Sequence, residues 1–233
     1  MKVLVACEYS GRVRDAFRDK GHDAWSCDLL PCNRGNKFHY VQDVFDVLPA
    51  RDWDLVIAHP PCTAICVSGN RHYSGSEARK QGVLFVERIW DYPCKMMAIE
   101  NPVGVLNSVG TKLPKPYYIQ PWQHGHGETK KTGLWTRGLP KLLPSNVVEG
   151  REARIHRMPP SEDRGKLRSL TYQGIADAMA DQWGQKGNTN RAAYYRAIIE
   201  EGIDEPIGFH KTWFNNCRFL HYHHSEGQDV QIV

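Results

Sequence analysis

The sequence lacks the features of a membrane-spanning or secreted protein. Among its 233 residues, no apolar run approaches the ~18 to 20 residues of a membrane span, and the longest runs, 3–7 and 55–58, have the length of buried strands. The N-terminus enters the first of these runs directly and then reaches Glu8, so we expect no signal peptide. The seven cysteines are odd in number and show no paired rhythm, which favours reduced thiols. We therefore expect a cytoplasmic protein without a membrane partner.

Metal-binding patterns are scarce as well. No CxxC pair occurs, and Cys62 and Cys66 have no comparable second pair that would complete a zinc site. The C-terminal segment holds His210, Cys217 and three further histidines, but their spacing fits no standard zinc finger. We predict no metal.

The composition is that of an ordinary folded protein, with 41% hydrophobic and 24% charged residues, which argues against intrinsic disorder. The net charge of +4 is unevenly distributed, because acidic and basic residues balance over residues 1–110 while the positive excess lies in residues 111–168. A concentrated positive segment suits a polyanionic partner, although a solvated basic face explains it equally well.

Alternating strands and helices indicate an α/β fold with a mostly parallel, doubly wound sheet. Nearly continuous apolar character in the strands implies a sheet covered on both faces. The strands are expected over 2–6, 23–27, 54–59 and 95–99, with short ones near 117–120 and 133–136. Helices are expected from about residue 12, capped by Ser10, and over 76–92, 174–183 and 191–201. We place one catalytic domain at 1–184 and a small helical and aromatic extension at 185–233.

Four segments lie where strands of such a sheet end, which is where ligands bind in doubly wound folds. They are Cys7–Gly11, Asp28, His59–Thr63 and Glu100–Pro102. A tight turn after the first strand and an acid after the second suit a nucleoside cofactor, although Asp28 is equally explained as a solvated turn residue. Because GxGxxG and Walker A patterns are absent, a cofactor without a pyrophosphate fits best.

The third segment presents a thiol, since two prolines restrict the backbone just before Cys62. A lone cysteine is most often structural, but Glu100 closes the next long strand and its carboxyl could meet a ring that Cys62 attacks. His59 could assist proton transfer or serve as a hydrogen-bonded structural histidine.

The order of these motifs resembles the DNA cytosine-5 methyltransferases, and most closely the short phage-type DNA methylases. The resemblance covers about residues 1–184. It rests on Leu4-Val5-Ala6-Cys7-Glu8-Tyr9-Ser10-Gly11, Cys27-Asp28, Gln42-Asp43-Val44, Pro60-Pro61-Cys62, Glu100-Asn101-Pro102, and more loosely on Gly125–Trp135 and Tyr172–Met179.

The resemblance implies a Rossmann-like methyltransferase domain that uses S-adenosylmethionine. It implies that the Cys62 thiolate adds to C6 of cytosine, that Glu100 binds the N3 edge, and that C5 then takes the methyl group. The target base must be flipped out of DNA or already single-stranded. The implied cofactor-binding residues are Ala6, Cys7, Glu8, Ser10, Gly11, Asp28, Asp43, Val44, Pro60 and Gly174. Protection of phage DNA against restriction, in a host cytoplasm, is what the resemblance suggests as its purpose.

The chain departs from the family pattern in three places. Its cofactor loop offers only Gly11 in place of Phe-x-Gly-x-Gly-Gly, the paired arginines after the glutamate motif read Lys130 and Thr132, and the final Gly-Asn reads Gly174-Ile175. The recognition segment, about residues 111–168, is short. We expect DNA contacts, mainly to phosphates, from Asn101, Lys130, Arg151, Arg154, Arg157, Arg164 and Arg168.

Two other functions remain open from the sequence. Thymidylate synthase and the dCMP hydroxymethylases also place their nucleophile in a Pro-Cys segment, so the chain could modify a free pyrimidine nucleotide with a folate cofactor. A non-catalytic DNA-binding protein that keeps the fold without turnover is the other alternative.

Overall fold

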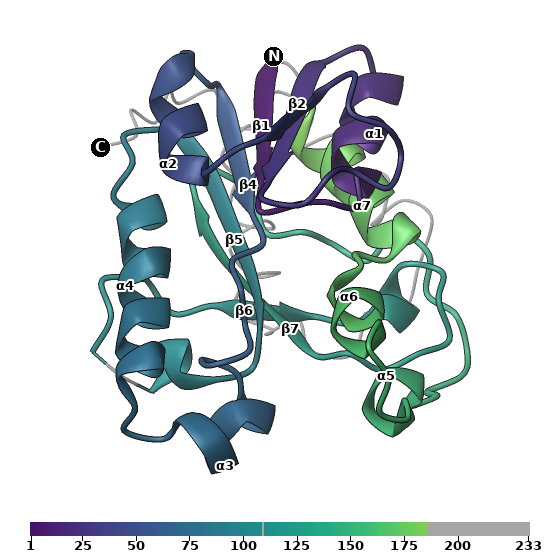
Figure 1. Cartoon of the computed structure of the whole chain (residues 1–233). Helices are drawn as coiled ribbons and strands as arrows, with labels where there is room; N and C mark the ends of the chain where they lie inside the picture. The colour runs from purple at the N-terminus through teal and green to yellow at the C-terminus, as the bar shows by residue number, and fades with distance from the viewer. Residues whose placement is uncertain (109, 186–233) are drawn as a thin grey trace, which may run out of the picture. The chain divides into compact units, whose positions relative to one another are not determined.

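The structure is a computed structural model that describes residues 1–108 and 110–185. Its centre is a seven-stranded sheet in the order β3-β2-β1-β4-β5-β7-β6, in which β7 runs antiparallel to both of its neighbours and the other neighbouring pairs are parallel (Figure 1). The strands are β1 (Lys2–Ala6), β2 (Asp23–Asp28), β3 (His39–Val41), β4 (Leu55–Ala58), β5 (Met96–Pro102), β6 (Tyr117–Ile119) and β7 (Thr132–Arg137).

Helices cover both faces of this sheet, with α1 and α7 on one side and α2 and α4 on the other (Figure 1). The α-helices are α1 (Arg12–Asp19), α2 (Val44–Val47), α3 (Asn70–Tyr73), α4 (Glu77–Trp90), α5 (Arg154–Arg157), α6 (Arg164–Ser169) and α7 (Gln173–Trp183). Short 3-10 helices are η1 (Leu48–Ala50), η2 (Val67–Gly69), η3 (Val105–Asn107) and η4 (Pro121–Gln123).

The core is divided in two because neighbouring side chains of a strand point to opposite faces. Val3 and Val5 of β1 pack with α1 and α7, whereas Leu4 and Ala6 pack with α2 and α4. All four side chains are fully buried, which explains why this strand is apolar throughout rather than alternating. The predicted α/β fold with a mostly parallel, doubly wound sheet is confirmed.

Several predicted boundaries need correction. The N-cap residue of helix α1 is Gly11, with φ 68°, and not Ser10. The Ser10 hydroxyl donates to the Glu8 side chain and accepts the backbone N–H of Arg12. Glu100 does not follow its strand but lies inside β5, because pairing of Glu100–Pro102 with β7 extends the ladder. The sequence pattern did not predict β3, α2, α3, α5 or α6. The predicted helix over 191–201 and nearly all of the predicted extension lie outside the described residues.

The sheet has a topological switch between β1 and β4. From β1 the chain continues to β2 and β3 on one side, while from β4 it continues to β5 on the other. Loops leaving two such strands diverge and open a crevice at their carboxyl ends. This edge of the sheet is where the four segments selected from the sequence meet.

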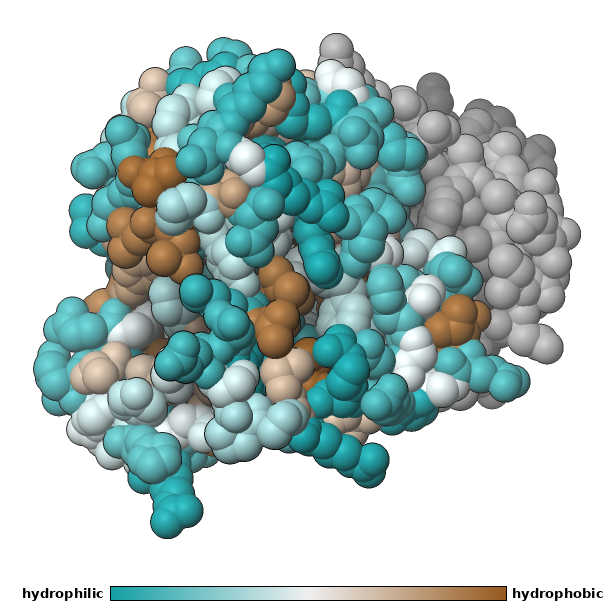
Figure 2. Space-filling view, turned by 45° about the vertical axis from the view of Figure 1, so that its right-hand side comes forward, coloured by the Kyte–Doolittle hydropathy of each residue, from teal (hydrophilic) through white to brown (hydrophobic). Residues whose placement is uncertain are grey.

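Among the described residues, no helix has the length and apolar character needed to cross a membrane. Eight large apolar side chains are exposed, among them Leu29, Val67 and Leu84. They come from different elements, and the face shown in Figure 2 is mainly hydrophilic with separate brown areas.

We predict that Gly174→Ala destabilises the fold. A Cβ at this position of α7 would lie 1.8 Å from the backbone oxygen of His124, so the helix or the loop must shift. Overpacking of this kind costs about 1 to 3 kcal/mol, which should lower the denaturant midpoint of unfolding. Gly110→Ala is the control, because a Cβ there meets nothing within 4 Å. Equal midpoints for the two variants would contradict the packing argument.

Candidate active site

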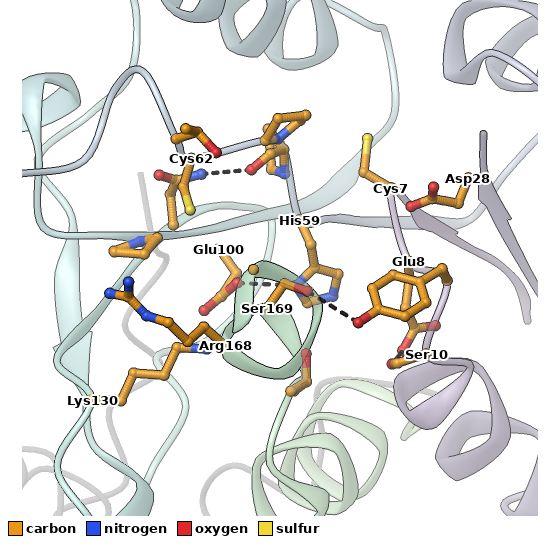
Figure 3. Close-up of a pocket in the computed structure, with 18 residues that line it drawn as sticks. Cys7, Glu8, Ser10, Asp28, His59, Cys62, Glu100, Lys130, Arg168 and Ser169 are labelled. Atoms are coloured by element: carbon orange, nitrogen blue, oxygen red, sulfur yellow. Dashed lines mark hydrogen bonds and ion pairs between the residues drawn. The ribbon is translucent and has the colours of Figure 1, made fainter. Parts of the chain in front are cut away.

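A cavity of about 260 Å³ opens at the carboxyl ends of β1, β2, β4 and β5 (Figure 3). The segment containing α6 supplies another part of its wall. Its lining consists of Cys7, Glu8, Tyr9, Ser10, Asp28, His59, Pro60, Pro61, Cys62, Thr63, Glu100, Asn101, Pro102, Lys130, Gly165, Arg168, Ser169 and Thr171. Predicted catalytic and cofactor-binding residues therefore share one cavity.

The loop after β1 turns sharply at Cys7. This residue adopts φ 56°, a left-handed conformation that is uncommon for residues other than glycine. The next residue, Glu8, donates its backbone N–H to the backbone oxygen of Cys27 over 3.0 Å, which ties the loop to β2. Asp28 is thereby held beside the loop, at the same cavity.

The Glu8 carboxylate occupies the N-terminus of α1. It accepts hydrogen bonds from the backbone N–H groups of Val13 (2.7 Å) and Arg14 (3.3 Å) and from the Ser10 hydroxyl (2.9 Å). Burial raises the pKa of Glu8, although these bonds and the nearby His59 oppose the rise. Because a protein carboxylate already takes the place where a phosphate binds in many nucleotide folds, this helix end has no free site for a pyrophosphate.

The two predicted cofactor acids lie differently. Asp28 lines the cavity, and its Oδ1 accepts the backbone N–H of Leu30 over 2.9 Å. Asp43 lies outside the lining and caps α2 by accepting the backbone N–H of Phe45 over 2.8 Å. The negative charges of both acids raise the pKa of Cys7, after the larger effect of burial, so both are close to the loop.

Two contacts hold the segment that carries Cys62. The Asn101 side chain donates from Nδ2 to the backbone oxygen of Pro60 over 2.9 Å, and the backbone N–H groups of Ile65 and Cys66 donate to the backbone oxygen of Cys62. Asn101 is 1% exposed, and its Oδ1 has no hydrogen-bond partner. β5 therefore positions the thiol as well as the carboxylate.

Cys62 is paired with a second thiol that the sequence analysis set aside. A hydrogen bond between the two side chains raises the pKa of Cys62, with burial adding to it, and lowers the pKa of Cys66. Cys66 precedes η2, where its sulfur lies 3.0 Å from the Ser68 hydroxyl and near the backbone N–H groups of Ser68 and Gly69. The Cys62 thiol must lose its proton before it can act as a nucleophile.

Glu100 is held as a carboxylate. Burial alone would raise the pKa of Glu100, but a hydrogen bond from His59 and the positive charge of Lys130 bring it below its ordinary value. The His59 Nδ1 lies 3.1 Å from Glu100 Oε2, and Figure 3 shows the two groups in contact at the centre of the cavity. Glu100 and Lys130 also act electrostatically on Cys62, with opposite signs.

The other predicted site residues lie outside the cavity lining. Ala6 and Val44 are buried in the core, Gly11 is the N-cap of α1, and Gly174 packs against the loop of His124.

Of the predicted DNA contacts, Asn101, Lys130 and Arg168 line the cavity. The other predicted arginines lie outside the lining. Arg151 stacks 3.9 Å from the centre of the Trp122 ring, and Arg154 forms an ion pair with Glu128 at 2.9 Å. Arg164 donates to the backbone oxygen of Met158, and Arg157 belongs to α5.

The sequence pattern did not predict that α6 forms part of the cavity wall. Tyr9 in the cofactor loop donates its hydroxyl hydrogen to the Lys166 backbone oxygen over 2.5 Å, and Ser169 donates to the Tyr9 hydroxyl over 3.3 Å. Arg12 donates to the backbone oxygen of Thr171 over 2.7 Å. The polar sequence of α6 contains no pattern that predicts these contacts, which join residues more than 150 positions apart.

Comparisons with known proteins find distantly similar solved structures but no matching family. No protein-family model matches the chain, and no curated protein matches it. The similar solved structures include a candidate DNA modification methyltransferase encoded within a prophage of E. coli (TM-score 0.46, 13% identity, covering 64% of this chain and 52% of that one). They also include the Entamoeba histolytica methyltransferase EhMeth (0.45, 15%, 66% and 58%) and the S. pombe Dnmt2 methyltransferase (0.39, 18%, 67% and 53%).

The chain spans between 52% and 58% of the length of these structures. At such identities the likeness concerns the fold alone. Within residues 1–108 and 110–185, no cluster of three or more His, Cys, Asp or Glu side chains is arranged to hold a metal ion.

We predict that replacing Glu8 by Gln changes the pH dependence of stability. The raised pKa means that folded Glu8 binds its proton more tightly than unfolded Glu8, whose ordinary pKa is 4.5. The wild type therefore loses stability as the pH rises above 4.5 and towards the folded pKa, and Glu8→Gln is spared this loss. The free energy of unfolding of the variant minus that of the wild type should increase between pH 4 and pH 7. The increase is about 1.4 kcal/mol for each unit by which the pKa of Glu8 in the folded protein exceeds that in the unfolded chain.

Urea unfolding at a series of pH values measures this difference. Glu77→Gln is the matched control, because Glu77 is exposed in the first turn of α4 and should show no such trend. A difference that stays constant or falls with pH would show that burial does not govern Glu8.

Proposed function

We propose that this protein transfers a methyl group from S-adenosylmethionine to C5 of cytosine in DNA, through a covalent bond between Cys62 and the base. The observation that carries the proposal is that a thiol, a buried carboxylate and the loop-and-acid pair expected for a nucleoside cofactor line one cavity. They reach it from the carboxyl ends of four neighbouring strands, where doubly wound folds bind their ligands.

The residues present fit an adenosine cofactor that carries no pyrophosphate. Glu8 closes the helix end that would bind one, while Asp28 offers a carboxylate for ribose hydroxyls beside the left-handed turn at Cys7. Asp43, which caps α2 close by, would serve the adenine end. When bound, S-adenosylmethionine supplies an electrophilic methyl group.

The other half of the cavity suits a pyrimidine ring. In the proposed reaction, Cys62 loses its proton and bonds to C6, while Glu100 takes up a proton and donates it to N3, which neutralises the negative charge that enters the ring. C5 then takes the methyl group and releases its proton, and the bond to Cys62 breaks. Pro60 and Asn101 hold the thiol in place through their 2.9 Å hydrogen bond.

Lys130 and Arg168 support DNA as the substrate, because both line the cavity and can meet the phosphates beside a flipped or unpaired cytosine. Arg151 and Arg154 are already engaged with Trp122 and Glu128, so phosphate contacts from them would require these partners to be shared or exchanged. We therefore expect Lys130 and Arg168 to contribute most to binding near the target base.

We predict that Cys62→Ala abolishes covalent trapping on DNA that contains 5-fluorocytosine. The wild type should form a stable adduct in the presence of S-adenosylmethionine, because fluorine at C5 cannot leave as a proton does. Denaturing gel electrophoresis and intact-protein mass spectrometry detect the adduct. Cys94→Ala, which removes a buried thiol of the other sheet edge, is the control and should trap normally.

Cys66→Ala should still trap, since the proposal assigns the bond to Cys62. Trapping lost in Cys66→Ala and kept in Cys62→Ala would reverse the assignment. Adduct formation with a free fluorinated nucleotide and folate, but not with DNA, would support the nucleotide-modifying alternative. No adduct with any of these would leave a DNA-binding protein without turnover.

We predict that Asp28→Ala weakens binding of S-adenosylhomocysteine by about 5- to 150-fold, as removal of a hydrogen-bond partner costs roughly 1 to 3 kcal/mol. Isothermal titration calorimetry measures the change. Asp46→Ala is the control, because Asp46 is an exposed acid of α2 outside the cavity lining. Unchanged affinity in Asp28→Ala would remove the acid from the cofactor site.

A further inference from the structure

His59 lies between two buried carboxylates. Its Nδ1 is 3.1 Å from Glu100 Oε2, and on the other side its charge acts on Glu8. The His59 side chain is 9% exposed, and Figure 3 shows its ring between Glu100 and the cofactor loop. The carboxylates come from the loop after β1 and from β5, and β4 places the histidine between those strands.

The second ring nitrogen of His59 is available to a ligand. Nε2 is buried, lacks a hydrogen-bond partner among the described residues, and belongs to a side chain that lines the cavity. His39 satisfies both of its nitrogens, bonding to Ser26 and to the backbone of Leu30, whereas the buried Nε2 of His124 has no partner either. His124 lies outside the cavity lining, so the position of His59 beside Glu100 in the cavity is what distinguishes it.

The charges around the His59–Glu100 pair favour a proton shared within it. Lys130 and the Thr132 hydroxyl face Glu100 from the strand β7 side, and Glu8 faces His59 from the β1 side. Cys62 and Arg168 line the same cavity from the β4 loop and from α6. A proton on the imidazole would thus be flanked by two negative groups, Glu8 and Glu100.

We propose that His59 is a positioning residue for Glu100. It orients the Glu100 carboxyl and supplies, through Glu100, the proton that N3 of the target pyrimidine takes up when Cys62 adds to C6. This inference rests on the proposed function, since it concerns the same reaction. Glu100 is ionised before the reaction, so the proton starts on His59. As the sulfur bonds to C6, the C5=C6 electron pair moves into the ring. The Nδ1 proton of the protonated His59 passes to Glu100, and Glu100 passes it to N3, which leaves a neutral imidazole. Elimination of Cys62 reverses both transfers, so no other reactant is needed.

The experiment compares wild type with His59→Gln in the rate of adduct formation on 5-fluorocytosine DNA as a function of pH. Gln can keep a hydrogen bond to Glu100 but carries no proton to transfer. We expect the wild-type rate to rise as Cys62 deprotonates and to fall at higher pH as His59 loses its proton. His59→Gln should be slower by about 100-fold or more and should lack the falling limb.

His72→Gln, an exposed histidine of α3, is the control and should behave as the wild type. A falling limb that persists in His59→Gln at the wild-type rate would overturn the proposal. A rate that falls while both limbs remain would also overturn it, because that is the result of a merely structural contact.

A second readout does not depend on turnover. Carbon-13 NMR of the Glu100 carboxyl, assigned with Glu100→Gln, should show a higher pKa in His59→Gln, because Gln lacks the positive charge by which His59 also lowers the pKa of Glu100. An unchanged Glu100 titration would overturn the inference even if the adduct forms. If Glu100 responds but wild type forms no adduct, the proposed reaction fails while the pairing stands.

If His59→Gln does not fold, the titration of Glu100 in the wild type tests the proposal by itself. The Glu100 resonance must then respond twice across the pH range, once to its own ionisation and once to that of the imidazole. A single response would contradict a shared proton.

Discussion

The whole cavity depends on the parallel hydrogen-bond ladders that join β1 to β2 on one edge and to β4 on the other. Because all three strands run in the same direction, their carboxyl ends meet at one edge of the sheet. The apolar side chains that enforce this pairing, such as Leu4 and Val5, are completely buried and carry no chemistry themselves. This pairing brings Cys7, Asp28 and His59, which are distant in sequence, to the lining of one cavity. The parallel pairing of β4 with β5 brings Glu100 to the same cavity.

Two buried glutamates at this edge show how the surroundings decide the behaviour of one residue type. Glu8 has a raised pKa because burial outweighs the hydrogen bonds of the α1 N-terminus. Glu100 is buried too, but His59 and Lys130 lower its pKa. The first carboxylate closes a helix end against phosphate, and the second remains charged beside the thiol. In the proposed reaction, one shapes the cofactor site and the other acts on the base.

Much of this arrangement could be predicted from the sequence because it depends on local pattern. Continuous apolar runs predicted β1 and β4, and motifs at the ends of the four expected parallel strands predicted Cys7, Asp28, Cys62 and Glu100 as cavity residues. The α6 wall could not be predicted, since Gly165 and Ser169 belong to a polar segment positioned by contacts with Tyr9. Cys66 was missed because its importance comes from Ser68 and the turn that brings its sulfur to Cys62. Positive charge alone could not separate Arg168, which lines the cavity, from Arg154, which pairs with Glu128.

In the proposed function, the carboxyl edge of this sheet brings a methyl donor to C5 of cytosine. The most direct measurement is to incubate cytosine-containing DNA with S-adenosylmethionine that carries a deuterated methyl group, digest the DNA to nucleosides, and analyse them by mass spectrometry. We expect 5-methyl-deoxycytidine that contains all three deuterons, formed by the wild type and absent with Cys62→Ala. Unmodified DNA, or a label found only on a free nucleotide, would contradict it.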